Sequence, residues 1–117
     1  MLVITNGVLG NRKYIRVKKS IDILIDGRIN GRTTNIGMGG LYATMSEEIE
    51  DFLDYKIELK LPEMMSIFLE GIPLRSLHIR GGCFHTAISF KENTISEEDK
   101  HLLNDFLEEK GNYVARR

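Results

Sequence analysis

Short runs in which apolar and polar side chains alternate constrain the fold of this chain more than any other feature. The clearest run is "YKIELKLP", in which Tyr55, Ile57, Leu59 and Leu61 alternate with polar residues until Pro62. A period of two places the apolar side chains on one face of an extended strand. Further extended runs occupy residues 20–26, 28–36, 41–45, 66–71, 74–80 and 83–90. From these seven runs we expect about six strands, and we interpret 66–71 and 74–80 as short separate strands.

Turn signals separate these runs. Asp26-Gly27 predicts one hairpin, and Gly81-Gly82 predicts a tight two-residue turn in another. "GMGG", residues 37–40, is typical of a turn or bulge in which glycines supply positive φ. "SEEIEDFL", residues 46–53, is interpreted as one or two helical turns with Ser46 as the N-cap.

The last segment has a different pattern. Ser96, followed three residues later by Asp99, is a signature of a helix N-terminus, and Gly111 is expected to end the helix. Leu102, Leu103, Phe106 and Leu107 form one apolar stripe. Strands without β-α alternation, followed by one amphipathic helix, predict a mainly β fold. We expect a six-stranded antiparallel β-barrel with a C-terminal α-helix packed on it.

The chain length is that of one domain. Of its 117 residues 42% are hydrophobic and 28% charged, which is ordinary for a soluble globular protein. We expect a flexible N-terminal arm at residues 1–10, the barrel domain at 11–110 and a tail at 111–117.

Composition also limits the environment and the partners. A single cysteine, Cys83, cannot form an internal disulfide, so we expect a cytoplasmic protein. The N-terminus lacks the pattern of a signal peptide, and no apolar run approaches the roughly 20 residues of a membrane span, so we expect no membrane insertion. The pI of about 6.3 argues against a protein that coats DNA or RNA.

Positive charge is concentrated near the N-terminus. Residues 1–34 carry seven Lys or Arg against two Asp, a balance of +5, whereas the remaining residues carry nine basic and fifteen acidic side chains. The segment "NRKYIRVKKS", residues 11–20, alone holds five positive charges. Such asymmetry indicates that the protein binds an anion near its N-terminus.

Two features could bind such an anion. Arg12 and Arg16 present planar guanidinium groups, which hold phosphates bidentately and stack on flat rings. The amide of Asn35 can read a purine edge, and Gly39 and Gly40 would let a ligand approach the backbone. The alternatives are a solvated basic segment before the first strand and a bulge at a barrel corner.

Together these features resemble the PilZ family of cyclic di-GMP receptors, whose pattern is RxxxR followed by [DN]xSxxG. Here "RKYIR" supplies Arg12 and Arg16, and "NIGMGG" supplies Asn35 and Gly40; the likeness extends over residues 11–108. The resemblance implies a six-stranded barrel that binds this bacterial second messenger and passes the signal to an unidentified protein partner. It implies that the arginines clamp phosphate and stack on guanine, and that the N-terminal arm folds over the ligand.

The chain departs from this pattern at Gly37, where the family has Ser. Losing one neutral hydrogen bond lowers affinity by about two- to tenfold. Thr33 shares strand parity with Asn35 and is expected to support the site with its hydroxyl. Lys13 and Gly39 are expected to support the site because of their positions within the two motifs. The alternative is a degenerate PilZ-like adaptor that binds no nucleotide and acts through protein contacts in motility or secretion.

Other chemistry has weaker support in the sequence. A two-residue turn at Gly81-Gly82 would place His78, Cys83 and His85 on one face, but a fourth metal ligand is not evident, so we expect no metal site. No nucleophile has a neighbouring base and orienting group, so we expect no catalytic residues, no cofactor and no enzyme activity.

Overall fold

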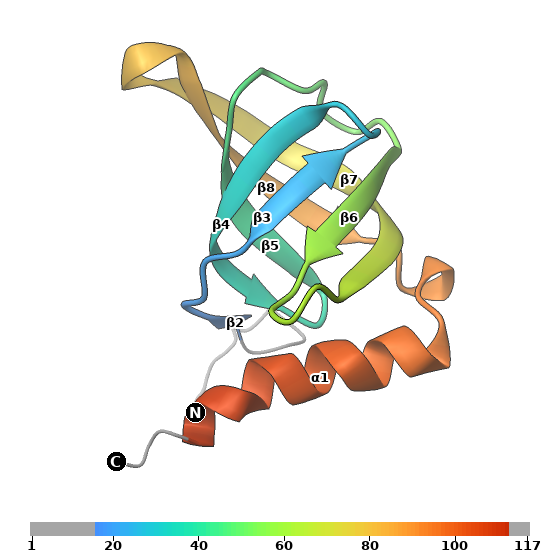
Figure 1. Ribbon diagram of the computed structural model, residues 1–117. Coiled ribbons are helices and arrows are strands. Elements are labelled where there is room, and N and C mark those ends of the chain that lie inside the picture. The colour runs from blue at the N-terminus through green and yellow to red at the C-terminus, as the bar shows by residue number, and fades with distance from the viewer. Residues whose placement is uncertain (1–15, 113–117) are drawn as a thin grey trace, which may run out of the picture.

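A computed structural model describes residues 16–112, with the side chains of residue 80 and residues 109–112 left out of the description (Figure 1). The described residues form seven strands, two short 3-10 turns and one helix. They are β2 (Arg16–Val17), β3 (Asp22–Ile25), β4 (Ile29–Gly37), β5 (Gly40–Met45), β6 (Tyr55–Lys60), β7 (Ser66–Ile79), η1 (Arg80–Gly82), β8 (Cys83–Phe90), η2 (Glu92–Thr94) and α1 (Glu97–Asn112).

Six of the strands close into an antiparallel barrel. Their order is β4-β3-β6-β7-β8-β5, and pairing between β5 and β4 completes the ring. β2 pairs with the last two residues of β4, with Arg16 opposite Gly37. The predicted mainly β barrel with a C-terminal helix is confirmed, whereas β2 was not predicted because two residues are too few to show alternation.

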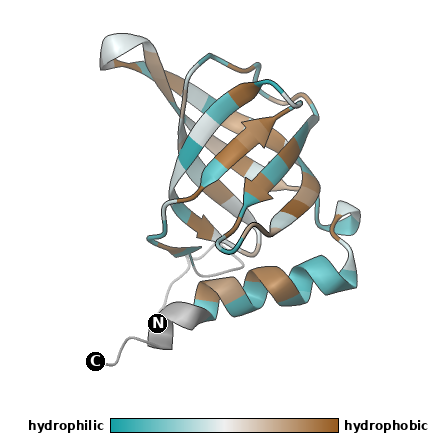
Figure 2. Cartoon of the chain, in the orientation of Figure 1, coloured by the Kyte–Doolittle hydropathy of each residue, from teal (hydrophilic) through white to brown (hydrophobic). Residues whose placement is uncertain are grey.

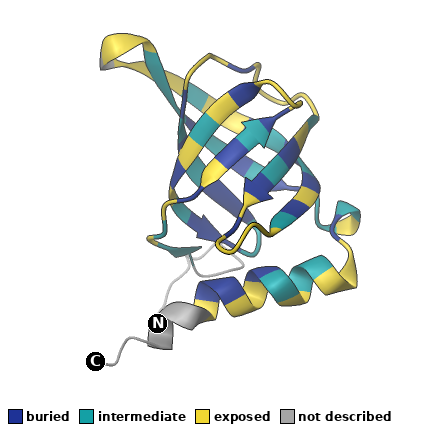
Figure 3. Cartoon of the chain, in the orientation of Figure 1, coloured by how far each residue is buried: buried dark blue, intermediate teal, exposed yellow. Residues whose placement is uncertain are grey.

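The barrel interior is filled by the apolar residues of the alternating runs. Ile23 pairs with Leu59 and Ile25 with Ile57, and each of these four side chains is at most 2% exposed. Hydrophobic positions alternate with hydrophilic ones along the strands (Figure 2), and the hydrophobic ones are buried (Figure 3). For β6, the period of two therefore predicted correctly which face of the strand points inward.

Helix α1 lies across one open end of the barrel (Figure 1). Leu103, Phe106 and Leu107 from the predicted stripe are buried against the barrel core. The hydroxyl of Ser96 accepts the N–H of Asp99 at 3.1 Å, which confirms the N-cap. The helix ends at Asn112, and such ends differ by a residue or two between assignments.

Two predictions of secondary-structure elements were wrong. Residues 46–54 form an irregular connection, because Ile49 is buried in the core and Phe52 has φ of 63°, both incompatible with a short exposed helix. The runs at 66–71 and 74–80 form one strand, β7, with an irregularity between Pro73 and Arg75. Proline is tolerated at such an irregularity, where the barrel strand bends from one neighbour to the next.

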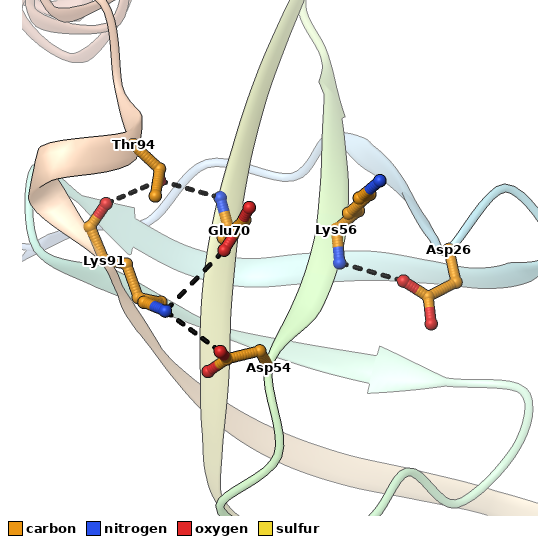
Figure 4. A network of polar contacts seen from close by, with 6 residues as sticks. All are labelled: Asp26, Asp54, Lys56, Glu70, Lys91 and Thr94. Atoms are coloured by element: carbon orange, nitrogen blue, oxygen red, sulfur yellow. Dashed lines mark hydrogen bonds and ion pairs between the residues drawn. The ribbon is translucent and has the colours of Figure 1, made fainter.

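A polar network joins β7 to the segment after β8 (Figure 4). The Nζ of Lys91 lies 2.9 Å from Asp54 Oδ2 and 3.7 Å from Glu70 Oε1. The hydroxyl of Thr94 donates to the Lys91 carbonyl at 2.6 Å and accepts the Glu70 N–H at 3.0 Å. We call Lys91, Asp54, Glu70 and Thr94 the Lys91 network. This network holds the segment between β8 and α1 against β7.

Candidate functional site

Four strands contribute to one cluster of side chains on the outside of the barrel. Arg16 comes from β2, Asn35 from β4, Tyr42 from β5 and His85 from β8. Asn35 pairs with Tyr42, and Arg16 pairs two residues further along β4, so β2 and β4 bring these side chains together. We call these four residues the arginine face.

The arginine face is held by ring contacts. The guanidinium carbon of Arg16 lies 4.6 Å from the centre of the Tyr42 ring, which is a cation–π distance. The Tyr42 and His85 rings have centroids 5.6 Å apart with a tilt of 36°. Sequence analysis missed Tyr42 and His85 as members of this cluster. The available signal for Tyr42 was an aromatic residue on the polar face of "LYATM".

Two polar atoms in this face are buried and lack hydrogen-bond partners among the described residues. They are Nη1 of Arg16, a donor, and Oδ1 of Asn35, an acceptor. Leaving a buried polar group unsatisfied costs about 1–3 kcal/mol, so each exception requires an explanation. A ligand with an anionic oxygen and an N–H group would satisfy both atoms at once.

Glycines near Asn35 have structural roles that differ from the prediction. Among the described residues, glycine φ is positive at Gly27, Gly81 and Gly82, so the expected positive φ at residues 37–40 is wrong. A Cβ on Gly40 would lie 2.4 Å from the Ile88 carbonyl oxygen, which means that strand β8 requires glycine there. Gly37 is buried in β4, and Gly39 lies in the turn to β5.

Thr33 does not share the face of Asn35. The pairing of β4 with β5 shifts between these two residues, so the expected strand parity is wrong. Thr33 is 2% exposed, and its hydroxyl accepts the Ile21 N–H at 2.9 Å and donates to the Lys19 carbonyl at 2.7 Å. Its hydroxyl is therefore committed to the connection between β2 and β3. Arg12 and Lys13 lie outside the described residues.

The hairpin of β7 and β8 has a different register from the predicted one. Its connection is the three-residue turn Arg80–Gly82, so His78 pairs with Phe84 while Cys83 and His85 pair with Ile79 and Leu77. His78 thus points to the opposite face. Within residues 16–112, no three His, Cys, Asp or Glu side chains are grouped to hold a metal ion.

Within the same described range, no helix is long and apolar enough to cross a membrane.

Comparisons with solved structures assign the fold. The chain is similar to the Bacillus subtilis inhibitor of motility MotI/DgrA, with a TM-score of 0.70 and 19% identity over 83% of this chain and 49% of that one. It is also similar to the PilZ domain of YcgR from Escherichia coli with c-di-GMP, with a TM-score of 0.62 and 13% identity over 83% and 88% of the two chains.

A third similar structure is the Borreliella burgdorferi PlzA protein in complex with c-di-GMP, with a TM-score of 0.57 and 18% identity over 86% of this chain and 42% of that one. The chain thus spans about half the length of MotI/DgrA and less than half of PlzA. No family model and no curated protein matches the sequence. The chain has the PilZ-like fold.

Proposed function

We propose that this chain is a cytoplasmic cyclic di-GMP receptor or adaptor, and not an enzyme, with the arginine face as part of its nucleotide site. The observation that carries the proposal is the pair of buried, unsatisfied atoms, Arg16 Nη1 and Asn35 Oδ1, beside the Tyr42 ring. The fold supports it, since structures of YcgR and PlzA with this fold contain c-di-GMP.

The ligand chemistry matches these two atoms. Arginine donates to phosphate oxygens in charge-assisted hydrogen bonds, and its flat guanidinium also stacks on a base. The Asn35 carbonyl would accept from the N–H groups of a guanine edge. Arg12 is proposed to join Arg16 on the phosphates, and Gly37, Gly39 and Gly40 to line the approach, with Lys13 adding positive charge.

A second candidate is an adaptor that binds no nucleotide and acts on a protein partner in motility or secretion. Two observations favour it. Gly37 provides no hydroxyl, and the Thr33 hydroxyl already bonds to Ile21 and Lys19, so it is not free to replace the missing serine. Two arginine–phosphate contacts are each about twice as strong as a neutral bond, and we therefore favour the receptor.

The deciding experiment is a calorimetric titration with cyclic di-GMP of the wild type and an Arg12→Ala/Arg16→Ala variant. The matched control is Arg28→Ala/Arg32→Ala, which removes the same charge from exposed ion pairs with Glu47 and Asp22. We expect binding to be lost only in the first variant. Equal binding by the wild type and the first variant would reject this site, and no binding by any form would favour the adaptor.

We further propose that ordering of the N-terminal arm is the signal that a partner reads. Closure of five to eight residues costs about 1–2 kcal/mol each, so it requires several ligand contacts to form together. Arg16 and Val17 already pair with β4 and would anchor the arm. Amide exchange over residues 6–17, with and without cyclic di-GMP, should show slowing before residue 16. Strong protection without nucleotide, unchanged by its addition, would contradict the switch.

A further inference from the structure

Strand β7 changes partners halfway along its length. Its first half, Ser66–Gly71, pairs with β6, and its second half, Gly71–Ile79, pairs with β8. Each half therefore has one edge that no neighbouring strand occupies. The two edges are treated differently by the rest of the molecule.

The open edge of the first half is covered. Lys91 donates its N–H to the Glu70 carbonyl at 2.8 Å, and the Glu70 N–H is taken by Thr94. Buried residues of β7 also face helix α1, whose Leu103 and Phe106 belong to the same core. This edge therefore has partners within the chain.

The open edge of the second half is not covered within the described residues. Phe52 donates its N–H to the Pro73 carbonyl at 2.8 Å, and past Pro73 no main-chain hydrogen bond reaches this side from the described parts of the chain. The hairpin end projects from the barrel beyond the neighbouring strands (Figure 1). We call Leu74–Ile79 the β7 edge. A strand exposed in this way presents unpaired N–H and C=O groups to any extended chain.

Apolar side chains gather along this edge. Five of the eight exposed large hydrophobic side chains of the described residues lie on or beside it. They are Phe52 (71% exposed), Leu53 (48%), Leu74 (47%), Leu77 (48%) and Ile79 (42%). Leu77 and Ile79 are two residues apart, so their side chains lie on the same face of the sheet. There they can contact side chains of a strand that is added at this edge. Such a cluster on a soluble domain typically marks a contact surface.

Charge narrows the choice of partner. The hairpin, residues 71–90, contains two arginines and two histidines and no acidic residue, although the whole chain has a net charge of -1. Arg75 is exposed at the edge and makes no ion pair with any described residue. An acidic side chain on the partner would find its counter-charge here. Two copies of the chain would instead bring two basic strands together.

We propose that the β7 edge receives an extended segment of a partner protein, which adds to the barrel as a further strand. Its apolar side chains lie at alternate positions against Leu77 and Ile79, and an acidic side chain passes Arg75. The main-chain groups supply a ladder of hydrogen bonds and the side chains supply selectivity. A nucleic acid or a lipid surface could use the charge but not this ladder.

The test selects a dodecapeptide library displayed on phage against the full chain without nucleotide, so that its outcome is independent of cyclic di-GMP binding. Enriched peptides are synthesised, and their affinities are measured by fluorescence anisotropy for the wild type and a Leu77→Lys/Ile79→Lys variant. We expect the enriched peptides to be acidic and to carry apolar side chains at alternate positions. Their affinity should be at least about tenfold lower for the variant than for the wild type. Because lysine adds positive charge, binding through charge alone would strengthen instead.

The control is Met64→Lys, which changes an apolar residue that is 99% exposed and lies outside the edge, and which should leave affinity unchanged. Amide exchange of the complex should slow at alternate residues of the β7 edge, and circular dichroism checks that each variant is folded. Failure to enrich peptides, or peptides insensitive to the double variant, would overturn the proposal. Self-association of the wild type that is lost in the double variant would also overturn it. So would binding of the wild type to vesicles of phosphatidylcholine and phosphatidylglycerol, if the double variant bound them more tightly.

Discussion

The arginine face and the Lys91 network are both clusters of polar side chains on the outside of one barrel. In the network, the Lys91 ammonium, the Thr94 hydroxyl and the Glu70 N–H all have partners within the chain. In the arginine face, Arg16 Nη1 and Asn35 Oδ1 are buried without a partner among the described residues. The polar groups of the first cluster are satisfied within the chain, whereas two atoms of the second have no partner among the described residues, and we propose that a ligand supplies it.

This difference separates stability from binding. Substitutions in the Lys91 network should lower the free energy of unfolding and leave affinity unchanged. Substitutions in the arginine face should change affinity and have little effect on unfolding, because they remove groups that the fold has not satisfied. Four measurements test this separation, from the largest expected effect to the smallest.

Arg16→Ala should weaken cyclic di-GMP binding about ten- to a hundredfold, since a hydrogen bond to a charged group contributes about 1.5–3 kcal/mol. Its free energy of unfolding should change by less, because the lost contact with Tyr42 is offset by removal of a buried unpaired Nη1. Calorimetry and urea unfolding measure the two quantities. A clear loss of stability with unchanged affinity would place Arg16 with the structural cluster instead.

Thr94→Val should lower the free energy of unfolding by about 1–3 kcal/mol, because it leaves the Glu70 N–H without its acceptor. Valine keeps the shape of threonine, so the change is mainly the loss of the hydroxyl. The matched control is Thr44→Val on β5, a half-buried threonine with no side-chain hydrogen bond among the described residues. Urea unfolding of both variants measures the effect, and equal destabilisation by the two would contradict it.

Gly37→Ser should tighten cyclic di-GMP binding by about two- to tenfold, the effect of one neutral hydrogen bond. Gly37 is not among the described glycines with positive φ, so backbone conformation does not oppose a side chain there. Gly39→Ser, in the adjacent turn, is the control and should give no gain. Weaker binding by Gly37→Ser would show that the buried position cannot accept the hydroxyl.

Lys91 should make a small pH-dependent contribution to stability. The hydrogen bond that the Lys91 ammonium donates to the Asp54 carboxylate, with the nearby charge of Glu70, raises the pKa of Lys91 above its ordinary value of 10.5. The protonated Lys91 side chain therefore stabilises the folded state at pH values below 10.5, and this stabilisation is lost as the pH rises through the raised pKa. The difference in unfolding free energy between wild type and Lys91→Met should shrink at alkaline pH. A difference that stays constant up to alkaline pH would contradict this contribution of Lys91.

The predictions from sequence were correct for features that depend on residues close together in the chain. Alternation identified Ile57 and Leu59 as inward-facing because side-chain direction in a strand repeats every two residues. The hairpin at Asp26-Gly27 formed with φ of 51° and 72°, and the Arg28 N–H donates to the Ile25 carbonyl at 3.0 Å. These features depend on residues at most four apart.

The sequence by itself determined most of the strands, the first hairpin, the helix cap and the two motifs that carry Arg16 and Asn35. Tertiary structure alone decided which side chains meet. It turned Thr33 away from Asn35 through a shift in pairing with β5, brought Tyr42 under Arg16, and required glycine at residue 40 because of Ile88. The reason is that register between distant strands depends on bulges and loop lengths, which a pattern with a period of two does not specify.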